Sequence, residues 1–253
     1  MKVSIIGYGN VATILGRKII ACGHEVIQVV GRDIEKTKYL AEKLFAKASD
    51  FSGLPDSNTE LFIVALSDSG IQECFSFLKS NTALVVHTAG SVSKDVLQNV
   101  SAYYGVLYPL QSLRKEMDQI PAIPILIDAN SEKAMQTIKL FAESISNQVS
   151  YLNDEERLKL HVAAVFVNNF TNHLYYLAEL ICKKEKIDFE LLKPLMQETV
   201  SRLNAASPEF LQTGPAIRKD ISTIEKHLEI LNEFPQLKSV YKTLTESIML
   251  NYS

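Results

Sequence analysis

The sequence predicts an α/β protein: a Rossmann-type, mostly parallel sheet followed by an all-helical C-terminal domain. Two observations carry this prediction. In the first part of the chain, short β-branched runs alternate with helical patterns, as they do in βαβ units. From Asp154 onward the strand patterns end and only long helical patterns follow. We therefore expect two domains, at 1–152 and 153–253.

The first predicted domain alternates strands with helices. Gly23 stands where a helix C-cap glycine is expected, just before the second strand. Parallel strands joined by helices form a sheet that is covered on both faces. The predicted strands are Lys2–Ile6, Glu25–Val30, Leu61–Ala65, Ala83–His87, Tyr103–Tyr108, Ile123–Ile127 and Gln148–Tyr151, and the predicted helices are Val11–Ala21, Ile34–Leu44, Ser69–Leu78 and Glu132–Ser146.

The second predicted domain contains helices alone. Asp188 has the position of a helix N-cap, and Pro235 that of a residue at the start of a helix. Pro215, which follows Thr213 and Gly214, is also typical of a helix start. The predicted helices are Asp154–Lys184, Asp188–Leu203, Pro215–Asn232 and Gln236–Leu250.

Composition restricts the compartment and the partners. The chain of 253 residues is 47% hydrophobic and 22% charged, with a net charge of −3, so no electrostatic feature favours nucleic acid or an anionic membrane. No apolar stretch approaches the ~18 residues that cross a bilayer, and the chain begins without a signal-peptide pattern. The scattered cysteines Cys22, Cys74 and Cys182 lack metal-ligand spacing. We expect a cytoplasmic protein without a metal site.

A dinucleotide fingerprint opens the chain. Gly7-Tyr8-Gly9-Asn10-Val11-Ala12 has the GxGxxA pattern, directly after a predicted strand and at the start of a predicted helix. The glycines allow a tight turn and a close approach of the backbone to a pyrophosphate, and the helix N-terminus directs free N–H groups at the phosphates. We expect Gly7, Gly9, Asn10 and Val11 to bind a dinucleotide.

The end of the second predicted strand favours NADP(H) over NAD(H). NAD-binding proteins usually carry Asp or Glu at this position, where the chain has Gly31 followed by Arg32. A guanidinium is suited to a 2′-phosphate, and glycine leaves room for it. Asp33 has two interpretations, because it can contact a ribose or cap the helix that begins at Ile34.

Polar residues follow two further predicted strands at the edge where open α/β sheets bind ligands. After Leu61–Ala65 come Ser67 and Asp68, which we expect either to contact the cofactor or to cap the next helix. His87, Thr88 and Ser91 lie at the end of the next strand. We assign Thr88 to the cofactor, Ser91 to the substrate and His87 to catalysis, since imidazole titrates near neutral pH.

The long helix that begins at Asp154 carries polar residues in a helical register. His161, Asn168 and Asn172 fall on one stripe at about 100° per residue, on a helix that is apolar nearly all round and is expected to be buried. Buried polar groups need partners. We interpret His161 and Asn168 as catalytic candidates and Asn172 as a substrate contact, with hydrogen bonds in a core or dimer interface as the alternative.

Several segments together resemble a known family. The segments are the opening GxGxxA, the Ser67-Asp68 turn, His87-Thr88-Ala89-Gly90-Ser91, Tyr108-Pro109-Leu110-Gln111-Ser112, the run from His161 to Phe170, and Thr213 to Asp220 with His227. They resemble the Rossmann-like proteins with a DUF2520 C-terminal domain, which are labelled as NADP oxidoreductases. That family is similar to pyrroline-5-carboxylate reductases and F420-dependent NADP oxidoreductases.

The resemblance implies an N-terminal NADP-binding domain and a helical domain that closes a cleft and helps to form a homodimer. It implies no particular substrate. Members often carry His-Pro where this chain has Tyr108-Pro109, and Gly-Asp where it has Lys219-Asp220. The first difference argues against histidine chemistry at position 108. Gln111, in the turn that follows, is expected to contact the substrate or to hold its own loop.

The main functional hypothesis is therefore an NADP-dependent oxidoreductase. Hydride would pass between NADP(H) and a small carbonyl, imine or hydroxy compound held in an interdomain cleft, while the protein orients the substrate and supplies a proton. Two alternatives use the same sequence features. A sensor would bind NADP(H) without turnover, and a dimeric scaffold would bind no dinucleotide.

Overall fold

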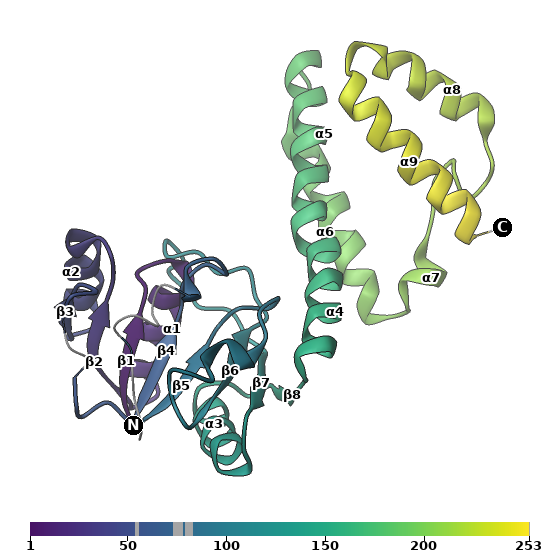
Figure 1. The fold of residues 1–253 in the computed structure, drawn as a ribbon. Coiled ribbons are helices and arrows are strands. Elements are labelled where there is room, and N and C mark those ends of the chain that lie inside the picture. Colours follow the sequence, from purple (N-terminus) through teal and green to yellow (C-terminus); the bar gives the residue numbers. More distant parts are fainter. Residues whose placement is uncertain (54–55, 73–77, 79–82, 253) are drawn as a thin grey trace. The chain divides into compact units, whose positions relative to one another are not determined.

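The computed structural model describes residues 1–53, 56–72, 78 and 83–252 (Figure 1). The chain divides into two compact units, Met1–Asn169 and Phe170–Ser253, and each is described by itself. The last strand of the first unit ends at Tyr151, and the helix that follows belongs to the same unit. The functional boundary at 152–153 stays a prediction.

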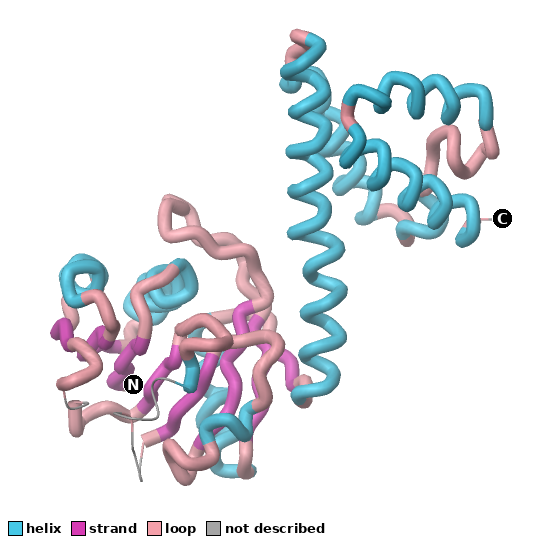
Figure 2. Tube along the Cα trace, turned by 45° about the horizontal axis from the view of Figure 1, so that its top comes forward, coloured by secondary structure: helices cyan, strands magenta, loops and turns pink. Residues whose placement is uncertain are grey.

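A single sheet of eight strands forms the centre of the first unit, with its strands side by side (Figure 2). The spatial order is β3-β2-β1-β4-β5-β6-β7-β8; β6 and β7 pair antiparallel, and every other neighbouring pair is parallel. The chain reverses its direction across the sheet between β1 and β4, which is where Rossmann-type folds bind ligands. The strands are β1 (Lys2–Ile6), β2 (Glu25–Val30), β3 (Lys47–Ser49), β4 (Leu61–Val64), β5 (Leu84–His87), β6 (Tyr104–Pro109), β7 (Ile125–Ala129) and β8 (Val149–Tyr151).

Most helices of this unit begin at a side-chain cap that the sequence encodes. Asp33, Ser131 and Asn153 each accept a hydrogen bond from the backbone N–H three residues ahead. At Asn153 the Glu156 side chain also returns to the cap backbone and completes a capping box. The helices are α1 (Asn10–Ala21), α2 (Ile34–Lys43), η2 (Lys94–Leu97), α3 (Glu132–Ile145), α4 (Asp154–Ala164) and the π-helical turn η3 (Val165–Phe170).

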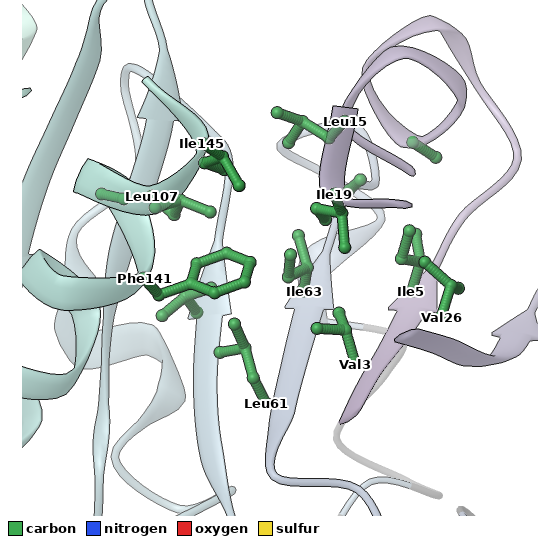
Figure 3. Packing of buried hydrophobic residues seen from close by; sticks show 14 of the residues in the cluster. Val3, Ile5, Leu15, Ile19, Val26, Leu61, Ile63, Leu107, Phe141 and Ile145 are labelled. Carbon is green, nitrogen blue, oxygen red and sulfur yellow. The ribbon is translucent and has the colours of Figure 1, made fainter. Parts of the chain in front are cut away.

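Alternating strand residues supply two apolar cores, one on each face of the sheet. Leu61 and Ile63 of β4 belong to one core, whereas Phe62 and Val64 belong to the other. Figure 3 shows the first core, where α1 and α3 bring their apolar faces to the strands. The labelled side chains are Val3, Ile5, Leu15, Ile19, Val26, Leu61, Ile63, Leu107, Phe141 and Ile145.

The predicted α/β order is confirmed, with differences at individual elements. All seven predicted strands are present with ends shifted by at most two residues. The edge strand β3 escaped prediction because Lys47, Ala48 and Ser49 are too short and too polar a run to give a strand pattern. Half of the predicted helix Ser69–Leu78, residues 73–77, lies outside the described residues, and so does Cys74.

The second unit is helical, as the sequence predicts. Asp188 caps its helical turn by accepting the Glu190 N–H at 3.0 Å. Among the described residues, no helix has both the length and the apolar character that crossing a bilayer requires. The elements are α5 (Thr171–Glu185), η4 (Phe189–Leu192), α6 (Lys193–Ser201), η5 (Arg202–Asn204), α7 (Pro208–Leu211), α8 (Ile221–Ile230), η6 (Leu231–Glu233) and α9 (Pro235–Asn251).

Two helix predictions in this half of the chain are wrong. The expected continuous helix Asp154–Lys184 is interrupted by η3, whose π-helical hydrogen bonds change the angular spacing of its residues. The helix expected from Pro215 begins only at Ile221, because Asp220 caps it by accepting the Thr223 N–H at 3.1 Å. Gly214, with φ of 108°, instead opens a turn.

Candidate functional site

The turn between β1 and α1 depends on glycine for steric reasons. Gly7 has φ of 121°, and a Cβ atom at this position would lie 2.3 Å from the carbonyl oxygen of Ala65. Its N–H donates to the Val30 carbonyl at 2.8 Å. Gly7 therefore holds the turn against the ends of both β2 and β4, at the reversal point of the sheet.

The N-terminus of α1 fits an anionic ligand. Gly9 caps the helix without a side-chain hydrogen bond, the first turn contains no acidic residue, and a Cβ on Gly9 would meet no atom within 4 Å. The leading N–H groups of α1, which Asn10 and Val11 begin, thus carry partial positive charge beside open space. Ala12 is fully buried and lets α1 approach the sheet closely. These features match the needs of a diphosphate.

The turn between β2 and α2 is built differently. Asp33 caps α2 by accepting the Lys36 N–H at 3.2 Å, and its carboxylate pairs with Lys36 Nζ at 3.0 Å. This contact to Lys36 holds the pKa of Asp33 below its ordinary value. Asp33 is thus the helix cap that the sequence offered as one of two interpretations.

Gly31 has a packing role that the sequence did not reveal. A Cβ at Gly31 would lie 2.5 Å from Tyr8 Cδ1 and 2.5 Å from Thr37 Oγ1. The expectation that the missing side chain leaves room for a phosphate is therefore wrong, because the Tyr8 ring and Thr37 fill that space. The adjacent Arg32 is exposed, and the Lys36 ammonium lies 5.8 Å from the centre of the Tyr8 ring.

The loops after β4 and β5 are tied to each other. Ser67 Oγ accepts the Gly70 N–H at 3.3 Å, so this residue stabilises its own turn. The neighbouring Asp68 accepts a hydrogen bond from Ser91 Oγ, and both residues are exposed. The buried Thr88 donates its N–H to the Val64 carbonyl at 3.2 Å. The two predicted contact regions therefore form one surface at the strand ends.

His87 has no free ring nitrogen. Its side chain is fully buried; Nδ1 accepts the Ala89 N–H at 3.2 Å, and Nε2 then carries the proton toward the Ser93 carbonyl at 3.3 Å. Burial, together with the nearby charge of Arg157, lowers the pKa of His87 to about 4. A neutral imidazole engaged on both sides cannot deliver a proton near pH 7. The interpretation of His87 as a catalytic acid is therefore wrong, and its role is structural.

His161 lies beside Tyr108, a residue to which the sequence assigned no role. Its Nδ1 lies 2.9 Å from Tyr108 Oη, and the two rings meet edge to face with centroids 5.9 Å apart. Gly90 lies beneath them, since a Cβ there would be 2.7 Å from His161 Nδ1 and 2.9 Å from Tyr108 Cζ. Burial raises the pKa of Tyr108. The phenol of Tyr108 thus keeps its proton near neutral pH.

An ion pair between a buried arginine and a half-buried aspartate holds α4 in place one turn before His161. Arg157, only 1% exposed, donates through Nη2 to the Val92 carbonyl and to Asp154 Oδ1, the latter at 2.7 Å. Burial alone would raise the pKa of Asp154, but hydrogen bonds from Ser93 and Arg157 outweigh it and leave the pKa below its ordinary value. These contacts join α4 to the segment after β5. They therefore help to set the position along α4 at which His161 contacts Tyr108.

Other predicted contacts are not brought to this pair. Gln111 donates to the Ala122 carbonyl at 3.0 Å and accepts the Ser112 N–H at 2.9 Å, so it holds its own loop. Asn168 lies in the π-helical turn and Asn172 in α5, both exposed, and the π-helical spacing breaks the stripe that was expected to join them to His161. The expected burial of this helix is also wrong within the single chain, where Val167 is 75% exposed.

The sequence contained partial signals for the residues it missed. Arg157 precedes His161 by four residues, and this spacing places both on one helix face. The sequence assigned no role to Tyr108, because only histidine chemistry was considered at this position, although a phenol can also exchange a proton. Within the described residues, no group of three or more His, Cys, Asp or Glu side chains is arranged to hold a metal ion.

The sheet order, the glycine turn and the uncapped α1 define a Rossmann-type dinucleotide-binding protein. Residues 2–89 match the family "NADP oxidoreductase coenzyme F420-dependent", and residues 123–248 match the domain of unknown function DUF2520. A solved structure described as a "putative NADP oxidoreductase" from Bacteroides fragilis is 36% identical, with a TM-score of 0.89 over 98% of this chain and 97% of that one. The chain belongs to this family of NADP oxidoreductases with a DUF2520 domain.

More distant structures share the fold. A reductive aminase from Aspergillus terreus, solved with NADPH and ethyl-5-oxohexanoate, is 15% identical with a TM-score of 0.69 and covers 97% of this chain and 94% of its own. A 1-pyrroline-5-carboxylate reductase from Streptococcus pyogenes is 14% identical with a TM-score of 0.64, covering 98% of both chains. A comparison with curated proteins finds no match.

Proposed function

We propose that this protein is an oxidoreductase that transfers hydride between NADP(H) and a small carbonyl, imine or hydroxy compound. Membership of the NADP oxidoreductase family supports the reaction class. The reductive aminase of the same fold was solved with NADPH and ethyl-5-oxohexanoate, and another structure of this fold is named a 1-pyrroline-5-carboxylate reductase; both names support this choice of substrate class.

The cofactor site that we propose uses the two glycine turns. The backbone of Gly7, Gly9, Asn10 and Val11 binds the diphosphate, because α1 presents uncapped N–H groups beside open space. Arg32 binds the 2′-phosphate of NADP(H), which its exposed guanidinium can grip through paired hydrogen bonds. Ser67, Asp68 and Thr88 border the cofactor where β4 and β5 end.

The proton is handled by Tyr108 and His161 in this proposal. When bound, the nicotinamide supplies or accepts the hydride, and the substrate oxygen or nitrogen gains or loses a proton. The 2.9 Å contact between Tyr108 Oη and His161 Nδ1, packed on Gly90 just after β5, is the observation that carries this assignment. Reduction draws a proton from the pair, and either ring can hold or return it, because phenol and imidazole groups both serve as general acids and bases. Ser91 stays a candidate substrate contact.

The test is steady-state turnover of ketones and imines with NADPH by three variants. Tyr108→Phe removes the hydroxyl and His161→Gln the titratable ring, and each should lower kcat by roughly 100-fold while the Kd for NADPH stays within about twofold. His173→Gln, a change at an exposed histidine outside this pair, should leave kcat unaltered. If the wild type binds NADPH but reduces no substrate, the protein is a sensor; if both variants keep full activity, the proton assignment is wrong.

We also propose that the protein is a homodimer. The helical stretch around η3 exposes large apolar side chains, among them Val162 (52%), Phe166 (62%) and Val167 (75%). Soluble monomers rarely leave such apolar groups contiguous on their surface. Sedimentation equilibrium should give twice the chain mass, and Val167→Asp should shift the population to monomer. A wild-type monomer at micromolar concentration would contradict the proposal.

A further inference from the structure

The segment 110–124 connects β6 to β7 and is held as an ordered loop. At its base, the Leu110 N–H donates to the Pro124 carbonyl at 2.9 Å, and Gln111 bonds to the Ala122 carbonyl. Leu113 is buried in the core against which α1 packs, and Met117 packs against the same core. The segment is therefore part of the folded unit and has a defined position relative to α1.

Side chains of α1 itself hold the middle of this segment. Arg17 donates through Nη1 to the Met117 carbonyl at 2.6 Å and through Nη2 to the Asp118 carbonyl at 2.9 Å. At the start of α1, Asn10 Oδ1 accepts the N–H of Lys115 at 3.1 Å. The two contacts lie at positions seven residues apart on the helix, so the segment follows α1 toward its N-terminus.

The Asn10 contact places the backbone of Lys115 beside the N-terminus of α1, where we propose that the diphosphate binds. Asn10 is the first residue of α1, and its own N–H is among those that face the phosphates in our proposal. Lys115 is exposed, and within the part of the chain that the structure describes no carboxylate pairs with its ammonium group. The adjacent Arg114, by contrast, pairs with Glu116 at 3.7 Å.

Neither the glycine turn nor the first turn of α1 contains a cationic side chain. The backbone N–H groups supply only partial charge, while a dinucleotide diphosphate carries two full negative charges. A lysine has the flexible stem and the compact charge that reach a phosphate from a neighbouring loop.

We propose that Lys115 binds the diphosphate of the dinucleotide, and that Asn10 and Arg17 position the 110–124 segment for this contact. The inference rests on the proposed function, since it needs a dinucleotide on α1. It gives Asn10 a second role, because its side chain holds the lysine loop while its backbone faces the ligand. It also gives two cationic side chains different roles, since Lys115 binds the diphosphate and Arg32 binds the 2′-phosphate.

The test is calorimetric titration of the full chain with NADPH and with NADH. Both nucleotides contain the diphosphate, but only NADPH has the 2′-phosphate. Lys115→Ala should therefore raise the Kd for both by a similar factor of about five to ten, leaving their ratio unchanged, and the loss should shrink at high salt. Lys115→Arg keeps the charge and should bind within about threefold of the wild type. Arg114→Ala is the matched control, expected to stay within twofold.

Further variants test the positioning roles. Arg17→Ala should weaken the binding of both nucleotides. Adding Lys115→Ala to this variant should reduce the affinity little further, because the loop no longer holds the lysine in position. Thermal melting of each variant without nucleotide reports whether the fold is intact. A wild type that binds NADPH alongside a Lys115→Ala protein of equal affinity overturns this inference alone. A loss confined to NADPH also overturns it, whereas a wild type that binds neither nucleotide overturns the proposed function as well.

Discussion

The turns after β1 and β2 have the same length but prepare their helices for different partners. Residues 7–9 lead into α1 and residues 31–33 lead into α2, and each turn begins with glycine. The second ends in Asp33, which caps α2 with its own side chain. The first ends in Gly9, which leaves the N–H groups of α1 without a side-chain partner.

The difference shows how little sequence separates a self-contained helix from a ligand site. A carboxylate at the cap position satisfies the N-terminal N–H groups and neutralises the helix dipole. A glycine at the same position leaves both available to an anion. The two glycines are also required for different steric reasons. A Cβ atom at Gly7 would clash with the Ala65 carbonyl, whereas a Cβ atom at Gly31 would clash with the Tyr8 ring.

The largest effect is expected where the first turn meets β4. Gly7→Ala adds a Cβ 2.3 Å from the Ala65 oxygen at φ of 121°, and should lower the free energy of unfolding by about 3 kcal/mol or more. Gly23→Ala is the matched control: φ is also positive, at 83°, but no atom lies within 4 Å, so about 1 kcal/mol is expected. Urea denaturation measures both. Equal losses would show that the close approach of β4 has no energetic role.

Giving α1 the cap of α2 should convert the first turn into the second. Gly9→Asp places a carboxylate at the N-terminus of α1, where it can accept backbone N–H groups and repel a diphosphate. The Kd for NADPH should rise by at least roughly 100-fold, about 2.7 kcal/mol, while the melting temperature is kept or raised. Gly9→Asn, a neutral cap, separates the charge from the capping. Unchanged affinity in Gly9→Asp would remove α1 from the cofactor site.

His87, at the end of β5, adds a pH dependence to this edge of the sheet. Its pKa is lowered from 6.5 to about 4, so below pH 6.5 the unfolded chain binds a proton that the folded chain excludes. His87 therefore does not lower the free energy of unfolding above pH 6.5, and the free energy of unfolding decreases as the pH falls from 6.5 toward 4. The loss between pH 7 and pH 5 should be about 2 kcal/mol. In His87→Gln the urea midpoint should change less over this range, and equal pH dependence would contradict the assignment.

The smallest effect is expected at the cap of α2. Asp33→Ala removes the acceptor of the Lys36 N–H and should lower the urea midpoint slightly, while Asp33→Asn should lower it much less. Neither change should weaken the binding of NADH, because Asp33 caps α2 and is not proposed to contact the ribose. Stability curves and NADH titrations of the two variants give the answer. A tenfold loss of NADH affinity in Asp33→Ala would restore the ribose interpretation.

The fold was predictable because its signals are local. Strand runs, helix periodicity and the GxGxxA turn all lie within short windows of sequence, and so do caps such as Asp188. The short strand β3 and the π-helical turn η3 lacked such signals. The register of η3 decided which polar residues share a face, and so the grouping of His161 with Asn168 failed.

The site was predictable only in part, because much of it depends on contacts between distant residues. Tyr108 and His161 come from β6 and α4, and no sequence pattern announces their hydrogen bond. From sequence alone, His87 and His161 are equally good candidates for a catalytic histidine. The burial of His87 and its two hydrogen bonds to the backbone indicate a structural role instead. The sequence could not decide whether Asp33 contacts a ribose or caps α2, and the hydrogen bond to Lys36 in the structure shows that it caps the helix.

The most direct test of the central claim is a calorimetric titration with NADPH and NADH, using the wild type and Arg32→Ala. The proposed site predicts micromolar binding of NADPH, binding of NADH that is at least ~10-fold weaker (~1.4 kcal/mol), and loss of that difference in the variant. Binding of neither nucleotide would contradict the account, and a preference for NADPH that survives in Arg32→Ala would remove Arg32 from the 2′-phosphate.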